Sequence, residues 1–223
     1  NHPPVNARLV RYELKEQGIY LEAEADFSKD TRPRPDSNAP RLWKEEIYDG
    51  VYMNRRLFWN PNWLVEVFVV QADRPHQIDW VMHFNGQACK TPETAAVSPF
   101  SQNPPFCFLE KMRPLAASQE LINTYQTQDI YTTIYASQQN HHLYQGLGPG
   151  NPSDEKITYL IERTSGKQAI FCHLIEIRKD TPTIENVKFD LTGKDATIRI
   201  KEKQKTILLQ MKDQLPIQIT EIN

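Results

Sequence analysis

Residues 63–87 place the tightest constraint on what this chain can fold into. The segment 64–70 is almost wholly apolar, which is typical of a strand that is buried on both faces. The segment 77–84 alternates between two kinds of side chain, as a strand with two different faces does. Because the loop-forming residues 72–75 separate the two segments, we predict two strands joined by a short loop.

The second of these strands carries the most informative polar side chains of the sequence. Its period of two places Asp79, Val81 and His83 on one face. The opposite face holds Ile78, Trp80, Met82 and Phe84. A carboxylate and an imidazole on one face of a core strand indicate either a metal site or sugar-contacting surface, or a structural hydrogen bond between the two.

The rest of the chain is a succession of short segments with strand character. Residues 7–14 and 18–25 predict a hairpin, and residues 50–59 predict a further strand. The proline-containing segments 27–39 and 88–105 predict long surface loops. The later predicted strands are 106–113, 119–126, 129–137, 142–147, 156–163, 168–177, 183–191, 196–202, 206–210 and 215–220.

The sequence shows no amphipathic helix, no alternation of strands with helices and no internal repeat. We therefore predict an all-β fold: a large antiparallel β-sandwich of the supersandwich type, with about fourteen strands and little helix. Residues 1–223 are long enough for one large β domain or two small ones, and we expect a single sandwich.

The charge balance excludes one class of partner. A net charge of -2 and a pI near 6.3 give no basic surface for nucleic acid. The sequence has neither an apolar run of about 20 residues, as a membrane span requires, nor a signal peptide. The chain begins at Asn1 without a methionine, so we expect either a mature protein or a domain of a longer one.

Three cysteines and one histidine give predictions about the protein core. The cysteines Cys89, Cys107 and Cys172 lack the spacing of a metal site, and at least one of them must be unpaired. Cys107 and Cys172 lie in apolar segments, which favours buried thiols over a disulfide. His173 lies between apolar residues, which favours a structural histidine over a functional one.

Three further residues are candidates for substrate binding. His76 follows Pro75 at the entrance of a strand. This position is compatible with a cleft residue, with a third metal ligand or with an inert surface residue. His142 and Tyr144 precede the glycine-rich residues 146–150, where the backbone can approach a ligand closely unless the segment is an ordinary turn. Aromatic and amide side chains suit a carbohydrate. No catalytic triad, nucleophile elbow or HExxH motif is present.

Residues 7–87 resemble the C-terminal β-sandwich region of the heparinase II/III-like polysaccharide lyases. The likeness rests on the hairpin ARLVRYELKEQGIYLEAEA, the segment DGVYMNRRLFW and the strand PHQIDWVMHFNG. The later segment YLIERTSGKQAIFCHLIEI resembles the arginine-bearing strand pair near the end of that sandwich.

The resemblance implies an activity that is located mainly outside this chain. Members of the family cleave uronic-acid-containing polysaccharides by β-elimination, usually with Tyr and His as base and acid. Those residues lie in an N-terminal helical toroid and in a strand with a Ser/Ala-His-Asn-Thr pattern. The sequence around His2 does not match that pattern, so no catalytic residue is assigned to this chain.

The resemblance also implies a structural zinc in the sheet region. The later histidine ligand corresponds to His83, and Asp79 and His76 are neighbouring candidates. It further implies an acidic polysaccharide as substrate, heparin-like, heparan-like or alginate-like, and a periplasmic or secreted location. The leading hypothesis is therefore the sheet domain of a polysaccharide lyase. The alternatives are a non-catalytic carbohydrate-binding or structural β-sandwich and a complete enzyme that uses His76, Asp79 and His83.

Overall fold

The computed structural model describes residues 7–27, 48–89, 100–102, 106–115, 121–137, 141–152 and 154–222. These residues form fourteen strands and one short 3-10 helix, η2 (Phe106–Phe108), which confirms the predicted all-β fold. The strands are β1 (Ala7–Lys15), β2 (Gly18–Asp26), β3 (Val51–Trp59), β4 (Trp63–Phe84), β5 (Gln87–Ala88), β6 (Glu110–Pro114), β7 (Leu121–Thr127), β8 (Ile130–Ala136), β9 (His142–Pro149), β10 (Lys156–Arg178), β11 (Ile184–Thr192), β12 (Asp195–Glu202), β13 (Thr206–Met211) and β14 (Gln218–Ile222). None of the described segments is a helix of the length and apolarity that crossing a membrane requires.

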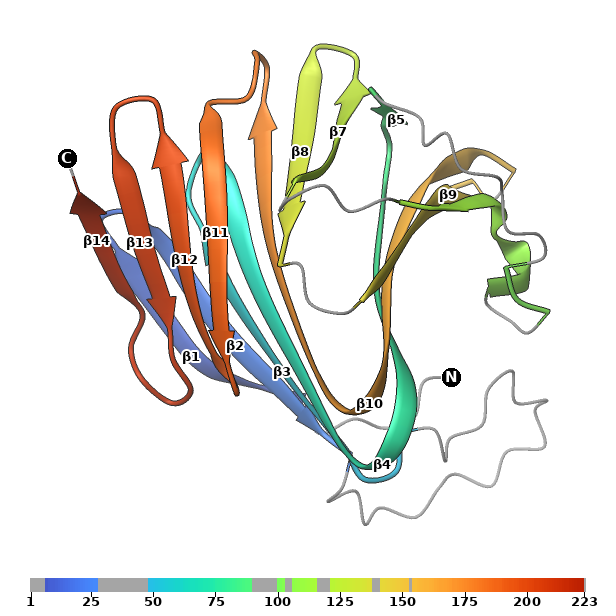
Figure 1. Cartoon of the computed structure of the whole chain (residues 1–223), viewed down its shortest axis with the longest axis horizontal. Helices are drawn as coiled ribbons and strands as arrows, with labels where there is room; N and C mark the ends of the chain where they lie inside the picture. Colours follow the sequence, from blue (N-terminus) through green and yellow to red (C-terminus); the bar gives the residue numbers. More distant parts are fainter. Residues whose placement is uncertain are drawn as a thin grey trace.

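The strands form two antiparallel sheets (Figure 1). The larger has ten strands in the order β1-β2-β3-β4-β10-β8-β7-β5, with β9 paired to both β10 and β6. The smaller has four strands in the order β11-β12-β13-β14. The predicted hairpin at the start of the chain is β1 and β2, and the predicted single strand at residues 50–59 is β3.

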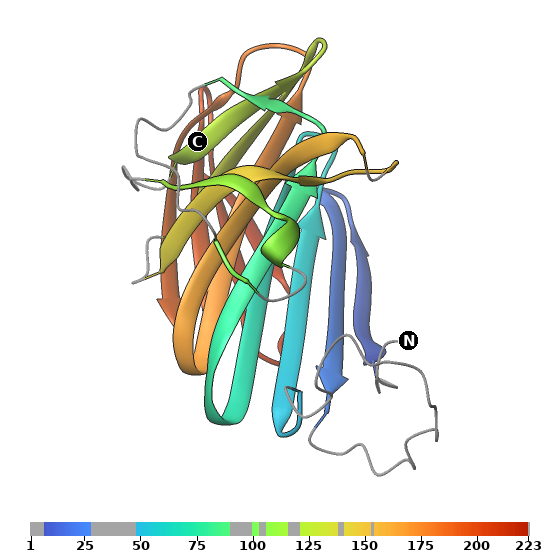
Figure 2. The ribbon, with the colours of Figure 1, turned by 90° about the vertical axis from the view of Figure 1, so that its right-hand side faces the viewer.

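The two longest strands correct the prediction for residues 63–87. The predicted loop 72–75 lies inside one continuous strand, β4, of 22 residues. The predicted turn 164–167 likewise lies inside β10, which has 23 residues. The two strands pair along almost their whole length and turn together at a bulge between Gly166 and Gln168 (Figure 1, Figure 2). Residues 72–75 therefore form a bend within β4 and not a chain reversal, because β10 pairs with β4 on both sides of them.

The shared bend gives the molecule two cores. One lies between the sheets, where Val65, Val67 and Val69 of β4 meet Ile198 and Leu209 of the small sheet. The other lies inside the bend and contains residues from both halves of the bent strands: Val70, Ile78, Trp80, Leu160 and Phe171. The first half of β4 is therefore buried on both faces, and Ile78 and Trp80 face the core in its second half, as predicted.

A buried arginine connects the two sheets. Arg56 of β3 is fully buried, and its guanidinium donates hydrogen bonds to the carbonyl oxygens of Met211, at 2.8 Å, and of Lys194. Both carbonyls belong to the small sheet or its turns. This side chain thus provides fixed polar contacts between the two sheets.

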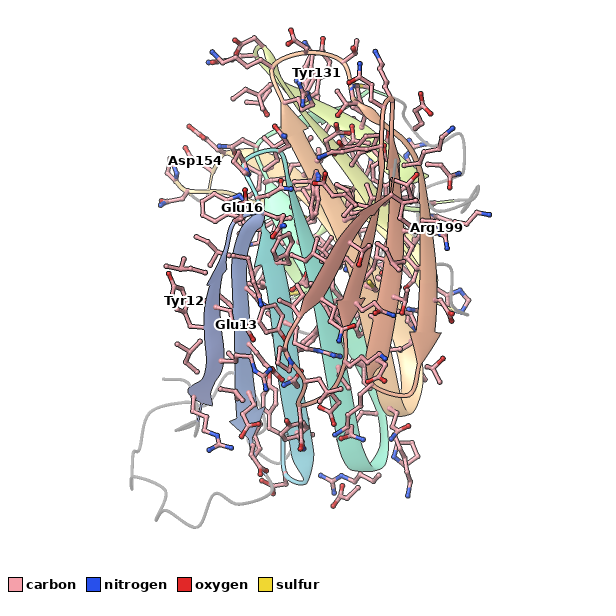
Figure 3. The ribbon with its side chains drawn as sticks, turned by 90° about the vertical axis from the view of Figure 1, so that its left-hand side faces the viewer. Tyr12, Glu13, Glu16, Tyr131, Asp154 and Arg199 are labelled. Atoms are coloured by element: carbon pink, nitrogen blue, oxygen red, sulfur yellow. The ribbon has the colours of Figure 1, made fainter. Side chains whose placement is uncertain are left out.

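Edge strand β1 presents large apolar side chains to solvent. Leu9, Tyr12 and Leu14 are all more than half exposed, as is Trp59 two strands away. Figure 3 shows Tyr12 and Glu13 along this outer edge, with Arg199 on the small sheet. The register pairs Leu9, Tyr12 and Leu14 with the apolar Ala23, Leu21 and Ile19 of β2.

Three local predictions are wrong. Cys107 is exposed in η2, whereas Cys172 is fully buried as predicted, and all three cysteines are free. The predicted strand 106–113 is instead η2 followed by β6. The glycine-rich residues after Leu143 continue β9 as far as Pro149, and a side chain at Gly146 would collide with the Glu110 carbonyl oxygen at 2.7 Å. These glycines allow β6 to pack against β9.

The loops predicted at 27–39 and 88–105 lie largely outside the described residues.

Candidate functional site

The bend in β4 and β10 gathers ionisable side chains that are far apart in the sequence. Antiparallel register pairs Glu162 with Trp80 in one half of the bent strands and His173 with Glu66 in the other half. All four side chains are buried, and Glu162 and His173 are almost completely so. Since buried charges are rare unless they are paired, this cluster is a candidate for a functional site.

Glu162 lies between two imidazoles. Its Oε2 is 2.6 Å from Nε2 of His173, and its Oε1 hydrogen-bonds to Nδ1 of His141. Burial raises the pKa of Glu162, but the charges and hydrogen bonds of His173 and His141 outweigh it and leave the pKa lowered. The carboxylate form is therefore favoured.

Glu66 closes the other end of the cluster. Its Oε2 accepts a 2.8 Å hydrogen bond from the Trp80 indole, whose ring stacks on His173 with centroids 3.7 Å apart. Its Oε1 lies 3.0 Å from Nε of Arg55, and that guanidinium sits over the Phe68 ring. The sequence of contacts Arg55–Glu66–Trp80–His173–Glu162–His141 thus runs from a half-exposed cation through the core.

His141 is the member of this cluster that borders a hollow. The hollow measures about 360 Å³. Its lining residues are Val69, Gln71, His141, Gln168, Ala169, Ile170, Leu191, Gly193 and Lys194. It lies where β10 has no second partner among the described strands, since β10 pairs with β9 up to Arg163 and with β8 from His173. The gap brings side chains of both sheets to one place.

The predicted pair Asp79 and His83 shares a face of β4 but not a site. Both carboxylate oxygens of Asp79 accept hydrogen bonds from Arg163, at 2.7 and 2.9 Å. His83 is exposed and stacks on Tyr159 with centroids 5.1 Å apart. Within the described ranges, no group of three or more His, Cys, Asp and Glu side chains could hold a metal. These contacts do not fit Asp79 as a zinc ligand, and the zinc stays a prediction.

The other predicted binding residues are dispersed. His76 lies half-buried at the bend, and its Nε2 is buried without a hydrogen-bond partner among the described residues. His142 is exposed on β9. Tyr144 packs edge-on against Phe100, which also stacks beneath Arg163. Their roles in substrate binding remain predictions.

Sequence patterns did not reveal the cluster itself. Glu66 and Glu162 each interrupt an apolar segment of a predicted strand. A charged side chain within such a segment is the one feature of the sequence that indicates a buried polar cluster. The apolar residues around His173 predict a structural role, and its full burial and hydrogen bond agree with one. His141 lies outside regular structure just before β9, so no periodicity could relate it to Glu162.

No family model matches this sequence, and no curated protein matches it either. Solved structures do. A heparinase III with methylated lysines aligns with a TM-score of 0.53 at 10% identity, over 92% of this chain and 27% of that one. A mutant heparan sulfate lyase HepC from Pedobacter heparinus aligns with a TM-score of 0.57 at 8% identity, over 92% and 28%. This chain shares its fold with part of each lyase.

The arrangement has two chemical capacities. A carboxylate that holds an imidazole by one nitrogen fixes the orientation of the ring, as in many sites that bind or transfer protons. Glu162 does this for His141 at the border of the hollow. The hollow also brings the cation Lys194 and the amides of Gln71 and Gln168 to the same lining. This combination suits a polar, negatively charged ligand.

Proposed function

We propose that this chain is the sheet domain of a polysaccharide lyase that acts by β-elimination on a uronic-acid-containing polysaccharide. The proposal rests on the structural alignments with the two lyases, each of which covers 92% of this chain. The chain spans little more than a quarter of either lyase, in keeping with one domain of a larger protein. In this proposal a helical toroid of the same protein supplies most of the catalytic residues, and the protein is periplasmic or secreted.

The proposed role of the domain is to form one wall of the substrate cleft. The shared fold, at 10% and 8% sequence identity, supports the proposed architecture. The proposed substrate is taken from the names of the two lyases, which refer to heparin and heparan sulfate. The cationic and amide lining near His141 adds a local reason for an acidic polysaccharide. His76, His142 and Tyr144 are the further binding candidates that sequence analysis supplies.

Two assays on the chain test this function. Binding to heparin, heparan sulfate and alginate is measured by calorimetry, with dextran as a neutral control. Cleavage is followed by the ultraviolet absorbance of unsaturated products. We expect binding to at least one acidic polysaccharide without turnover. Turnover by this chain alone would overturn the non-catalytic role, and failure to bind any acidic polysaccharide would overturn the substrate class.

A second candidate is a non-catalytic carbohydrate-binding module for neutral glycans. It is favoured by a hollow of about 710 Å³ whose lining includes Asn85, Gln87, Gln126 and Gln128. Such amides can hydrogen-bond to sugar hydroxyls. Binding of dextran or another neutral glycan, with no preference for charged ones, would favour this candidate over the lyase domain.

A further inference from the structure

The hollow beside His141 differs in charge from the chain as a whole. The protein has 28 acidic and 26 basic residues, yet no Asp or Glu is among the described residues that line this hollow. The polar side chains among those described residues are one lysine, one histidine and two glutamines. All of these can donate hydrogen bonds, and an anion accepts them.

The imidazole ring of His141 is held in place by Glu162. The His141 side chain is 7% exposed and hydrogen-bonds through Nδ1 to Glu162, which is itself 1% exposed. Glu162 is held in turn by His173 at 2.6 Å. An imidazole that is fixed in this way loses little conformational freedom when it binds a ligand, which favours affinity.

The lysine of the lining comes from the small sheet. Lys194 lies in the turn between β11 and β12, and its carbonyl oxygen accepts a hydrogen bond from the buried Arg56. The backbone at Lys194 is thereby tied to the large sheet. Its ammonium is 5.3 Å from the Tyr52 ring centroid and 3.8 Å from an oxygen of Asp213, which does not line the hollow.

We propose that this hollow is a binding site for a single anionic group, the carboxylate or sulfate of an acidic sugar. Lys194 supplies the charge, His141 donates from Nε2 when both nitrogens of its ring carry a proton, and the amides of Gln71 and Gln168 complete the contacts. Val69, Ile170 and Leu191 form an apolar wall against which the ring of a sugar can pack. The identification of the anion as part of a polysaccharide rests on the proposed function, whereas the site itself does not.

The test uses small probes and a charge-removing variant of the whole chain. Sodium glucuronate supplies a carboxylate, glucosamine 6-sulfate supplies a sulfate, and glucose supplies neither. The ring signals of His141 are followed by NMR during titration, with the exposed His83 as an internal reference. We expect saturable shifts at His141 with one or both anionic probes and none with glucose. Equal shifts with glucose, or none with either anion, would overturn the site.

Lys194→Met removes the charge and keeps most of the aliphatic stem. We expect affinity for the anionic probe to fall about tenfold, as the loss of a charge-assisted hydrogen bond predicts. Lys201→Met is the matched control, because this lysine is on the same sheet, pairs with Glu185 and does not border the hollow. It should leave affinity unchanged. Equal affinity of the wild-type and Lys194→Met chains would contradict the proposal.

The outcomes separate this site from the proposed function. If acidic polysaccharide binds equally well to wild type and Lys194→Met, the function stands and the site is wrong. If glucuronate binds at His141 but no acidic polysaccharide binds, the site stands and the function is wrong.

Discussion

His173 Nε2 lies 2.6 Å from Glu162 Oε2, although the two residues are eleven positions apart on the same strand. In a straight strand that separation would be about 36 Å. The contact therefore exists only because β10 folds back on itself at Gly166, and because β4 bends beside it. The geometry of the cluster and the bend of the sheet depend on each other.

Replacing the central carboxylate should weaken the fold. Glu162→Gln keeps the shape of the side chain but removes the charge between two buried imidazoles. We expect the free energy of unfolding to fall by about 3 kcal/mol, the usual effect of removing one partner from a buried ion pair. Chemical denaturation measures it. Glu185→Gln, on an exposed pair with Lys201, is the control and should change stability by less than about 0.5 kcal/mol.

The same carboxylate should make stability depend on pH in acid. The pKa of Glu162 lies below its ordinary value of 4.5 in the folded chain, so the unfolded chain takes up the proton first. Its contribution is thus fully present above about pH 4.5 and is lost as the pH falls through the lower folded value. The stability difference between wild type and Glu162→Gln should shrink on acidification. A difference that grows toward low pH would contradict the lowered pKa.

The buried arginine gives a prediction about the contact between the sheets. Arg56→Met fills similar space but leaves the carbonyl oxygens of Lys194 and Met211 without their guanidinium donors. We expect a loss of about 3 kcal/mol in the free energy of unfolding. Arg199→Met, on the exposed face of the small sheet, should have little effect (Figure 3). Equal stability of the two variants would show that Arg56 contributes nothing to the interface.

Close packing at β9 makes one glycine hard to replace. In Gly146→Ala the new methyl group would meet Met112 and the carbonyl oxygen of Glu110. We expect a loss of about 1 to 3 kcal/mol, as for overpacking elsewhere. Gly86→Ala is the matched control, since its nearest neighbour would lie at 3.1 Å, and its loss should be smaller. Thermal unfolding of both variants provides the comparison.

Zinc is tested by analysis of the purified chain. The family resemblance predicts about one zinc per chain with His83 as a ligand. His83→Ala should then lower both the metal content and the melting temperature. Tyr159→Leu, which removes only the ring that stacks on His83, serves as the control and should retain the metal. A wild-type chain that is free of metal and as stable as His83→Ala would end the prediction.

Much of the fold follows from local pattern. Alternation correctly predicted which side chains of residues 78–84 face the core, and the apolar run before them correctly predicted burial on both faces. Turn residues located the hairpin of β1 and β2. These features depend on neighbours within a few positions, which a sequence displays directly.

The bend and the cluster were not predicted, for a physical reason. Asp73 and Pro75 are equally compatible with a chain reversal and with a bend, and the choice depends on whether a distant strand turns alongside. The contacts of Glu162 with His141 and His173 depend on that same choice. Asp79 shares its face with His83 as predicted, but its partner is Arg163 on the neighbouring strand.

The pairing of β4 with β10 also has a consequence for how the chain is made. β4 (Trp63–Phe84) is complete long before its central partner, β10 (Lys156–Arg178), is synthesised. Contacts between segments so far apart in sequence are slow to form. During synthesis the apolar first half of β4 therefore pairs with β3 on one edge only. Its other edge stays unpaired until the ribosome has passed residue 178, the last residue of β10.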